Sequence, residues 1–156
     1  MSLHRAQLHW TRGQAEFLGG RYSRQHELRF AQTIRVVGSA SPSVVPAQYC
    51  VNDAVDPEAA FVAALAGCHM LWFLSIAASA GFIVEDYLDS AQGTLGPDAT
   101  GALAMTDILL QPVVRFAAQA APSPSTFEAL HEKAHAECFL ARSVRCPVRI
   151  RATQVT

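Results

Sequence analysis

Two cysteines, Cys68 and Cys138, are the residues whose type and placement offer chemistry. Cys68 falls in the middle of an apolar helical stretch and Cys138 on the apolar face of a second expected helix, where free cysteines ordinarily serve as small buried hydrophobes. A second interpretation is a redox pair, in which one thiolate attacks a peroxide and the other cysteine resolves the product. That chemistry needs a cation beside the attacking sulfur. Arg21 and Arg24 precede the first helix and are candidates, although solvated surface positions suit both.

A metal site is the competing interpretation of the same region. His131, His135 and Cys138 recur at i, i+4 and i+7 on one helical face, and Cys68 would be a fourth ligand of a kind that zinc accepts. Structural zinc sites usually take close ligand pairs from two segments, and this chain offers one such cluster. His69 follows Cys68 directly, but adjacent helical residues point about 100° apart, so we expect no contact between imidazole and thiol.

The longest expected element is a helix over residues 56–82. Asp56 suits the N-cap, Pro57 the first helical position and Gly81 the C-terminal stop. Past its first turn this helix carries no charged residue, so it must be buried on every side or lie in lipid. Its high alanine content and its acidic flanks without a Lys/Arg cluster argue against a membrane span. We therefore expect the core helix of a globular domain.

The rest of the chain is expected to form short strands and one more helix. The predicted strands cover residues 6–17, 22–29, 33–37, 83–94, 102–118 and 147–155. Residues 38–57 form a long loop, and a second helix covers residues 126–143, with Ser125 as N-cap and Glu128 as its capping-box partner. Strands grouped before helices, rather than alternating with them, indicate an α+β fold with antiparallel sheets.

Composition narrows the class of protein. The 156 residues with a net charge of −1 predict one domain over residues 1–156 and give no electrostatic footprint for nucleic acid. The N-terminus lacks the apolar segment of a signal peptide, so we expect a cytoplasmic protein. There, four cysteines indicate redox or metal chemistry rather than a disulfide framework, and Cys50 and Cys146 receive no role. The low charged content of 16% indicates a surface partly covered by another subunit.

Three stretches of sequence resemble parts of a known family. DPEAAFVAALAGCHMLWFL, residues 56–74, resembles the signature of the OsmC/Ohr family (osmotically induced protein and organic hydroperoxide resistance protein), with a Pro-Glu pair and a cysteine ten residues after the glutamate. KAHAECFLARSV, residues 133–144, resembles the family's second cysteine motif, and GGR at 19–21 its arginine turn. The resemblance covers nearly the whole chain, and it places the chain in a branch apart from the two best-known members.

The resemblance implies a fold and an activity. The fold would be an intertwined homodimer with antiparallel sheets wrapped around a long buried helix. The activity would be a thiol peroxidase that reduces organic hydroperoxides and is regenerated by an external dithiol, without cofactor, metal, nucleic acid or membrane. Cys68 matches the peroxidatic cysteine and Cys138 the resolving one, while Arg21 matches the arginine that holds the thiolate and Glu58 its carboxylate partner. The apolar walls expected around the thiol are Phe61, Leu65, Leu71, Trp72 and Phe139.

Three points depart from that pattern or limit it. Phe139 follows Cys138 where the family usually has proline, and Arg24 could replace Arg21. In an unbroken helix, ten residues separate Glu58 from Cys68 by about 15 Å, so their meeting needs a helix break or another segment. A dimer in which Arg21 of one subunit reaches the Cys68 of the other would meet part of this requirement. The rival from another class is a non-catalytic small-ligand-binding or metal-binding protein of the same fold.

Overall fold

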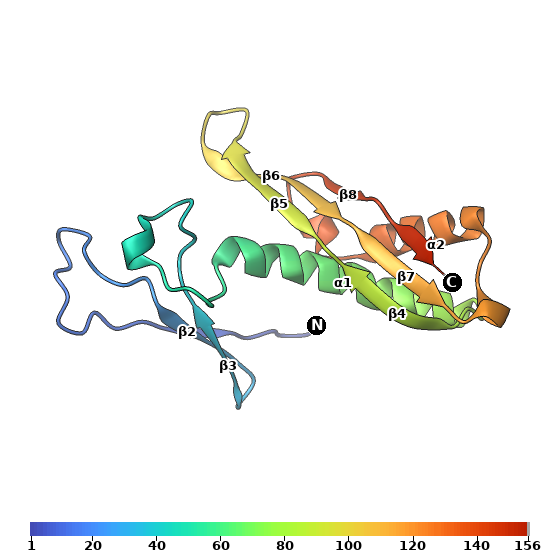
Figure 1. Ribbon diagram of the computed structural model, residues 1–156, viewed down its shortest axis with the longest axis horizontal. Coiled ribbons are helices and arrows are strands. Elements are labelled where there is room, and N and C mark those ends of the chain that lie inside the picture. The colour runs from blue at the N-terminus through green and yellow to red at the C-terminus, as the bar shows by residue number, and fades with distance from the viewer. Residues whose placement is uncertain (156) are drawn as a thin grey trace. The chain divides into compact units, whose positions relative to one another are not determined.

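The computed structural model describes residues 1–155 and divides into two compact units, Met1–Ala60 and a second unit from Phe61 onward (Figure 1). We expected one domain over residues 1–156. Residue 156 lies outside the described residues, and the single domain stays a prediction. The α+β class is confirmed, because the described residues form three small sheets and two α-helices.

The first unit is an antiparallel sheet followed by a loop. Its strands, in the order β1-β2-β3, are β1 (Gln7–His9), β2 (His26–Phe30) and β3 (Ile34–Gly38), and a 3₁₀ turn η1 (Ala47–Tyr49) lies in the loop. The strand predicted over residues 6–17 is reduced to β1. Gly13 explains this, because its φ of 61° turns the backbone out of the extended region.

Helix α1 (Pro57–Ser79) begins and ends where the sequence predicts. The Asp56 side chain accepts a hydrogen bond from the Ala59 N–H at 2.7 Å, and Gly81, with φ of 85°, follows the helix end. Within the chain only one side of α1 is buried. Leu71 on the opposite side is 65% exposed, so the expected burial on every side is not reached within one chain.

By length and composition, α1 is the one helix among residues 1–155 that could cross a membrane, with 28% of its most apolar stretch buried. Core helices of globular proteins pass the same test.

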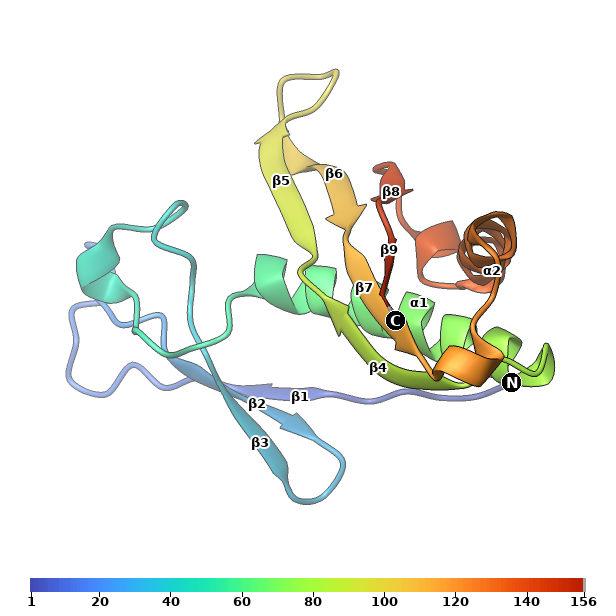
Figure 2. The ribbon, with the colours of Figure 1, turned by 45° about the vertical axis from the view of Figure 1, so that its right-hand side comes forward.

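The strands of the second unit form two three-stranded sheets, β4-β7-β9 and β5-β6-β8 (Figures 1 and 2). Their bounds are β4 (Val84–Asp89), β5 (Gln92–Pro97), β6 (Leu103–Leu110), β7 (Pro112–Phe116), β8 (Val148–Ile150) and β9 (Thr153–Val155). The two long strands predicted over residues 83–94 and 102–118 are each divided, the second immediately before Pro112, which has no N–H to donate.

The prediction of wholly antiparallel sheets is wrong for the C-terminal strands. β4–β7 and β5–β6 are antiparallel, but β6–β8 and β7–β9 are parallel. The reason is the connection: helix α2 lies between β7 and β8, and a crossover of that length lets the chain return in the same direction.

Helix α2 (Pro124–Glu137) starts earlier and ends earlier than predicted. Its N-cap is Ser123, whose hydroxyl accepts from the Thr126 N–H, so the predicted capping role of Ser125 is wrong. Pro124 favours this earlier start because it suits the first turn. Short 3₁₀ turns precede and follow α2 at η2 (Ala118–Ala120) and η3 (Ala141–Ser143).

Both helices pack on one face of β7 and form one hydrophobic core with it. Side chains of this strand alternate between buried and exposed, and Val114 and Phe116 point into the core. They contact Phe73 from α1 and Phe127 from α2, with ring centroids of Phe73, Phe116 and Phe127 about 6 Å apart, a spacing typical of edge-to-face aromatic pairs.

Candidate active site

Cys68 and Cys138 lie in contact in the core of the second unit. Cys68 occupies the middle of α1, and Cys138 is the residue that caps the C-terminus of α2. Their sulfur atoms are 2.8 Å apart, both thiols are free, and 7% of Cys68 and 1% of Cys138 are exposed. Since a disulfide bond is about 2.05 Å long, the two sulfurs can bond after a shift of less than about 1 Å.

The end of α2 fixes the position of Cys138. Its N–H donates to the carbonyls of Ala134 and His135 at 3.0 and 3.2 Å, and the Ala141 N–H donates to its Sγ at 3.4 Å. Burial, reinforced by the hydrogen bond to Cys68, raises the pKa of Cys138 to about 11. Cys138 therefore keeps its proton at neutral pH, and its S–H donates to the sulfur of Cys68.

A pocket of about 290 Å³ gives access to Cys68. It is lined by Cys68, Leu71, Trp72, Ser75 and Phe139. The three lining residues from α1 follow Cys68 at i+3, i+4 and i+7, so helical spacing alone could have identified Ser75, which the sequence analysis missed. Cys138 does not line this pocket, so a small molecule entering it meets Cys68 first.

Two of the predicted walls are wrong. Leu65 is 2% exposed and packs with Ile108 and Leu110, and Phe61 packs against the same cluster. The cause is their place on the helix: both lie on turns that precede Cys68, over the strands, and the pocket opens on the turns that follow.

A buried histidine pair lies between α1 and α2. His69 Nε2 and His131 Nδ1 are 3.0 Å apart, and the rings are stacked. Burial, with a contribution from His135, lowers the pKa of His69 to about 4, and burial beside His69 lowers the pKa of His131 to about 3. Both rings are therefore neutral at pH 7, and, as expected, His69 turns away from Cys68.

This pairing contradicts the metal interpretation. His131 points to His69, while the Cys138 sulfur points to Cys68, so the proposed ligands do not converge. Across residues 1–155, no group of three or more His, Cys, Asp and Glu side chains has the geometry to hold a metal ion.

Arg21 and Arg24 belong to the first unit and differ in how firmly they are held. Arg24 lies over the Tyr22 ring, with Cζ 3.7 Å from the centroid, and donates to the carbonyls of Gly20 and Tyr22. Arg21 is exposed and has one ion pair with Glu16 at 3.6 Å. A solvated pair of this kind is weak, so Arg21 is the guanidinium more available to another group.

Glu58 lies in the first turn of α1. Its Oε2 is buried with no hydrogen-bond partner among the described residues. Because α1 continues without a break, the axial rise from Glu58 to Cys68 is about 15 Å. The helix break that would join them within one chain is absent from the described residues.

The two other cysteines, Cys50 and Cys146, are half-buried. The Cys50 thiol donates to the Val45 carbonyl at 3.5 Å, and Cys146 packs against the cluster formed by Leu65, Ile108 and Leu110. No reactive partner surrounds either of them among the residues that the structure describes.

A protein-family profile matches most of this chain. The profile of the family described as OsmC-like protein matches residues 51–153, about two thirds of the chain and including both buried cysteines. No curated protein sequence matches.

Solved structures share the fold over nearly the full length. An OsmC-like protein of unknown function from Vibrio cholerae is 43% identical, covering 97% of this chain and 99% of its own, with a TM-score of 0.94. Two organic hydroperoxide resistance proteins, from Elizabethkingia anophelis and from Bacillus subtilis, are 16% and 15% identical with TM-scores of 0.68 and 0.64. Each covers 99% of this chain and 98% of its own, and at that identity the likeness concerns the fold alone.

Proposed function

This chain belongs to the OsmC-like protein family, and we propose that it is a thiol peroxidase that reduces organic hydroperoxides to alcohols. The observation that carries the proposal is the contact between two free thiols, one opening to a pocket and the other buried behind it. Cys68 attacks and Cys138 resolves. No metal or organic cofactor is needed for this chemistry.

The proposed cycle uses the proton on Cys138 twice. In the resting state its S–H donates to the Cys68 sulfur and stabilises the thiolate. The thiolate attacks the outer peroxide oxygen, the O–O bond breaks, and Cys68 keeps that oxygen with its hydrogen as a sulfenic acid. The alkoxide takes up a proton from solvent water in the open pocket and leaves as alcohol. Cys138 then attacks the Cys68 sulfur, which releases the hydroxyl with the Cys138 proton as water and forms the disulfide. An external dithiol reduces this disulfide by exchange.

The lining of the pocket supports an organic hydroperoxide as substrate. Leu71, Trp72 and Phe139 offer apolar surface on either side of the thiol, and Leu71 and Phe139 are 65% and 60% exposed. Burying an alkyl or aryl group against them contributes roughly 25 cal/mol per Å², which hydrogen peroxide cannot gain.

A thiol titration tests the proposal. Wild-type protein treated with one equivalent of cumene hydroperoxide should lose two thiols per chain, and Cys146→Ser should lose the same two. Cys68→Ser should lose none. A wild type that keeps all its thiols would favour the non-catalytic binder, and a loss of one thiol would remove Cys138 from the mechanism.

We further propose a homodimer in which Arg21 of one subunit approaches Cys68 of the other. The exposed side of α1 supports a second subunit, because it carries no charged residue past the first turn, leaves Leu71 65% exposed, and a helix without a charged face is normally buried. The weakly paired Arg21 then supplies the cation that a buried thiolate requires.

Mixed dimers test this arrangement. Cys68→Ser and Arg21→Ala subunits should each be inactive or slow alone, and co-refolding them should restore about a quarter of the wild-type rate, since half of the dimers are mixed and each has one complete site. Co-refolded Cys68→Ser and Cys138→Ser subunits, whose lesions share one chain's site, serve as the control that gains nothing. A monomer in sedimentation, or equal rates in both mixtures, would refute the exchange of Arg21.

A further inference from the structure

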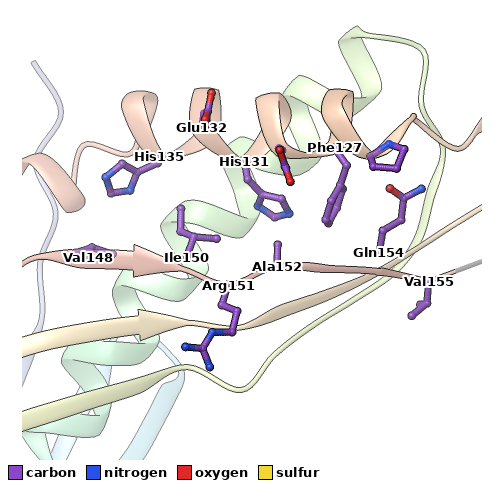
Figure 3. Close-up of a pocket in the computed structure, with 12 residues that line it drawn as sticks. Phe127, His131, Glu132, His135, Val148, Ile150, Arg151, Ala152, Gln154 and Val155 are labelled. Carbon is purple, nitrogen blue, oxygen red and sulfur yellow. The ribbon is translucent and has the colours of Figure 1, made fainter.

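A second pocket, of about 890 Å³, lies between α2 and strands β8 and β9 (Figure 3). Its apolar lining consists of Phe127 from α2 and, on the strand segment that forms the floor, Val148, Ile150 and Ala152 (Figure 3). It shares no lining residue with the pocket over Cys68, so the thiol chemistry leaves it unexplained.

Three buried polar atoms of this pocket have no hydrogen-bond partner among the described residues: His131 Nε2, His135 Nδ1 and Gln154 Oε1. His131 is 4% exposed, and Figure 3 shows its ring pointing from α2 toward the strand at Ala152. Its orientation is fixed, since the ring stacks on Phe73 at 4.2 Å and its Nδ1 is occupied by His69. Only Nε2 remains for a ligand.

The side chain of Gln154, on β9, is also fixed by a hydrogen bond. Its amide nitrogen donates to the Pro122 carbonyl at 3.0 Å, which leaves Oε1 as an acceptor without a donor. Leaving a buried polar group without a hydrogen bond is unfavourable, and three such groups in one pocket indicate that a partner satisfies them.

The chemistry of these atoms restricts the partner. Burial lowers the pKa of His131 to about 3, so the ring is neutral, and Gln154 is uncharged, so neither of these two side chains balances an ionised group. The charged side chains, Glu128, Glu132 and Arg151, are exposed at the mouth. Gln154 Oε1 requires a donor, while His131 Nε2 donates or accepts according to its tautomer.

A hydroxyl group supplies the donor that Gln154 Oε1 requires. We propose that this pocket binds an uncharged, largely apolar small molecule that carries a hydroxyl group, with the hydroxyl donating to Gln154 Oε1 and the apolar body against Phe127 and Ile150, beside the His131 ring. A volume of about 890 Å³ lies within the range of small-molecule sites, which is roughly 300–1,000 Å³.

A matched pair of probes tests the proposal on the full-length protein. 2-Naphthylmethanol and 2-methylnaphthalene share an apolar body and differ in the hydroxyl, so wild type should bind the alcohol about tenfold more tightly, as one buried hydrogen bond provides. Gln154→Leu should lose this preference. Thr153→Leu is the control, because Thr153 neighbours Gln154 on β9 without lining the pocket, and it should keep the preference.

The place of binding is read from NMR. The alcohol should shift the ¹⁵N signal of His131 Nε2 and leave the Trp72 indole, which lines the Cys68 pocket, unchanged. Ala152→Met, which fills the floor, should weaken both probes and serves as the second variant if Gln154→Leu does not fold. Absence of binding, equal affinity of the two probes for wild type, or shifts at Trp72 instead of His131 would each overturn the proposal. None of these outcomes depends on peroxidase activity.

Discussion

Cys138 has two proposed roles: its S–H donates a hydrogen bond to the Cys68 thiolate, and its sulfur later forms the disulfide. Comparing Cys138→Ser with Cys138→Ala distinguishes these roles. Its S–H lies 2.8 Å from the Cys68 sulfur and is 99% shielded from water, so no solvent molecule replaces it readily. A hydrogen bond to a charged group contributes about 1.5–3 kcal/mol, and because S–H is a weak donor the lower value applies. Losing about 1.5 kcal/mol of stabilisation at the attacking sulfur corresponds to an oxidation about tenfold slower.

Serine keeps a donor at this position and alanine removes it. Under stopped-flow mixing with one equivalent of cumene hydroperoxide at pH 7, Cys138→Ala should therefore oxidise about tenfold more slowly than wild type. Cys138→Ser should stay close to the wild-type rate. Without a resolving thiol, both variants should stop as a Cys68 sulfenic acid, which a sulfenic-acid trap and mass spectrometry identify, whereas wild type proceeds to the disulfide.

Two results would refute this reasoning. Equal oxidation rates for the serine and alanine variants would show that the Cys138 proton does not support the thiolate. A disulfide in either variant, formed with Cys50 or Cys146, would show that the observed sulfur contact does not select the resolving partner.

Three further predictions follow from the site. Cys68→Ser should abolish hydroperoxide consumption while near-UV circular dichroism stays native, and undiminished turnover would end the proposed mechanism. Arg21→Ala should slow the first oxidation and the alkylation of Cys68 at neutral pH, with little change in the urea midpoint because Arg21 is exposed; unchanged rates would transfer the role to Arg24. Burial lowers the pKa of His69 to about 4 and the pKa of His131 to about 3. As the pH falls below about 6.5, these histidines therefore take up protons in the unfolded state before they do in the folded state. The free energy of unfolding should then fall by up to about 1.4 kcal/mol per pH unit for each histidine until about pH 4. Urea midpoints at pH 7 and 5 should differ less in His131→Phe than in wild type; an equal difference would contradict this.

Local sequence predicted the elements whose causes are local. The cap by Asp56 and the stop at Gly81 depend on hydrogen bonds and backbone angles within a few residues, and α1 has both. The prediction was wrong where two nearby serines both suited the N-cap of α2. The N-cap is Ser123 and not Ser125, because Pro124 suits the first turn of the helix.

The sequence by itself determined that Cys68 would lie in an apolar helix and that Cys138 would follow at a second helix, since helical periodicity and the family signature are properties of short segments. Only the tertiary structure decided that their sulfurs lie 2.8 Å apart, that His131 turns to His69 instead of sharing a metal, and that the C-terminal strands run parallel to β6 and β7. These depend on how α1 and α2 pack on β7, and packing joins residues 62 to 70 positions apart, about which no local pattern carries information.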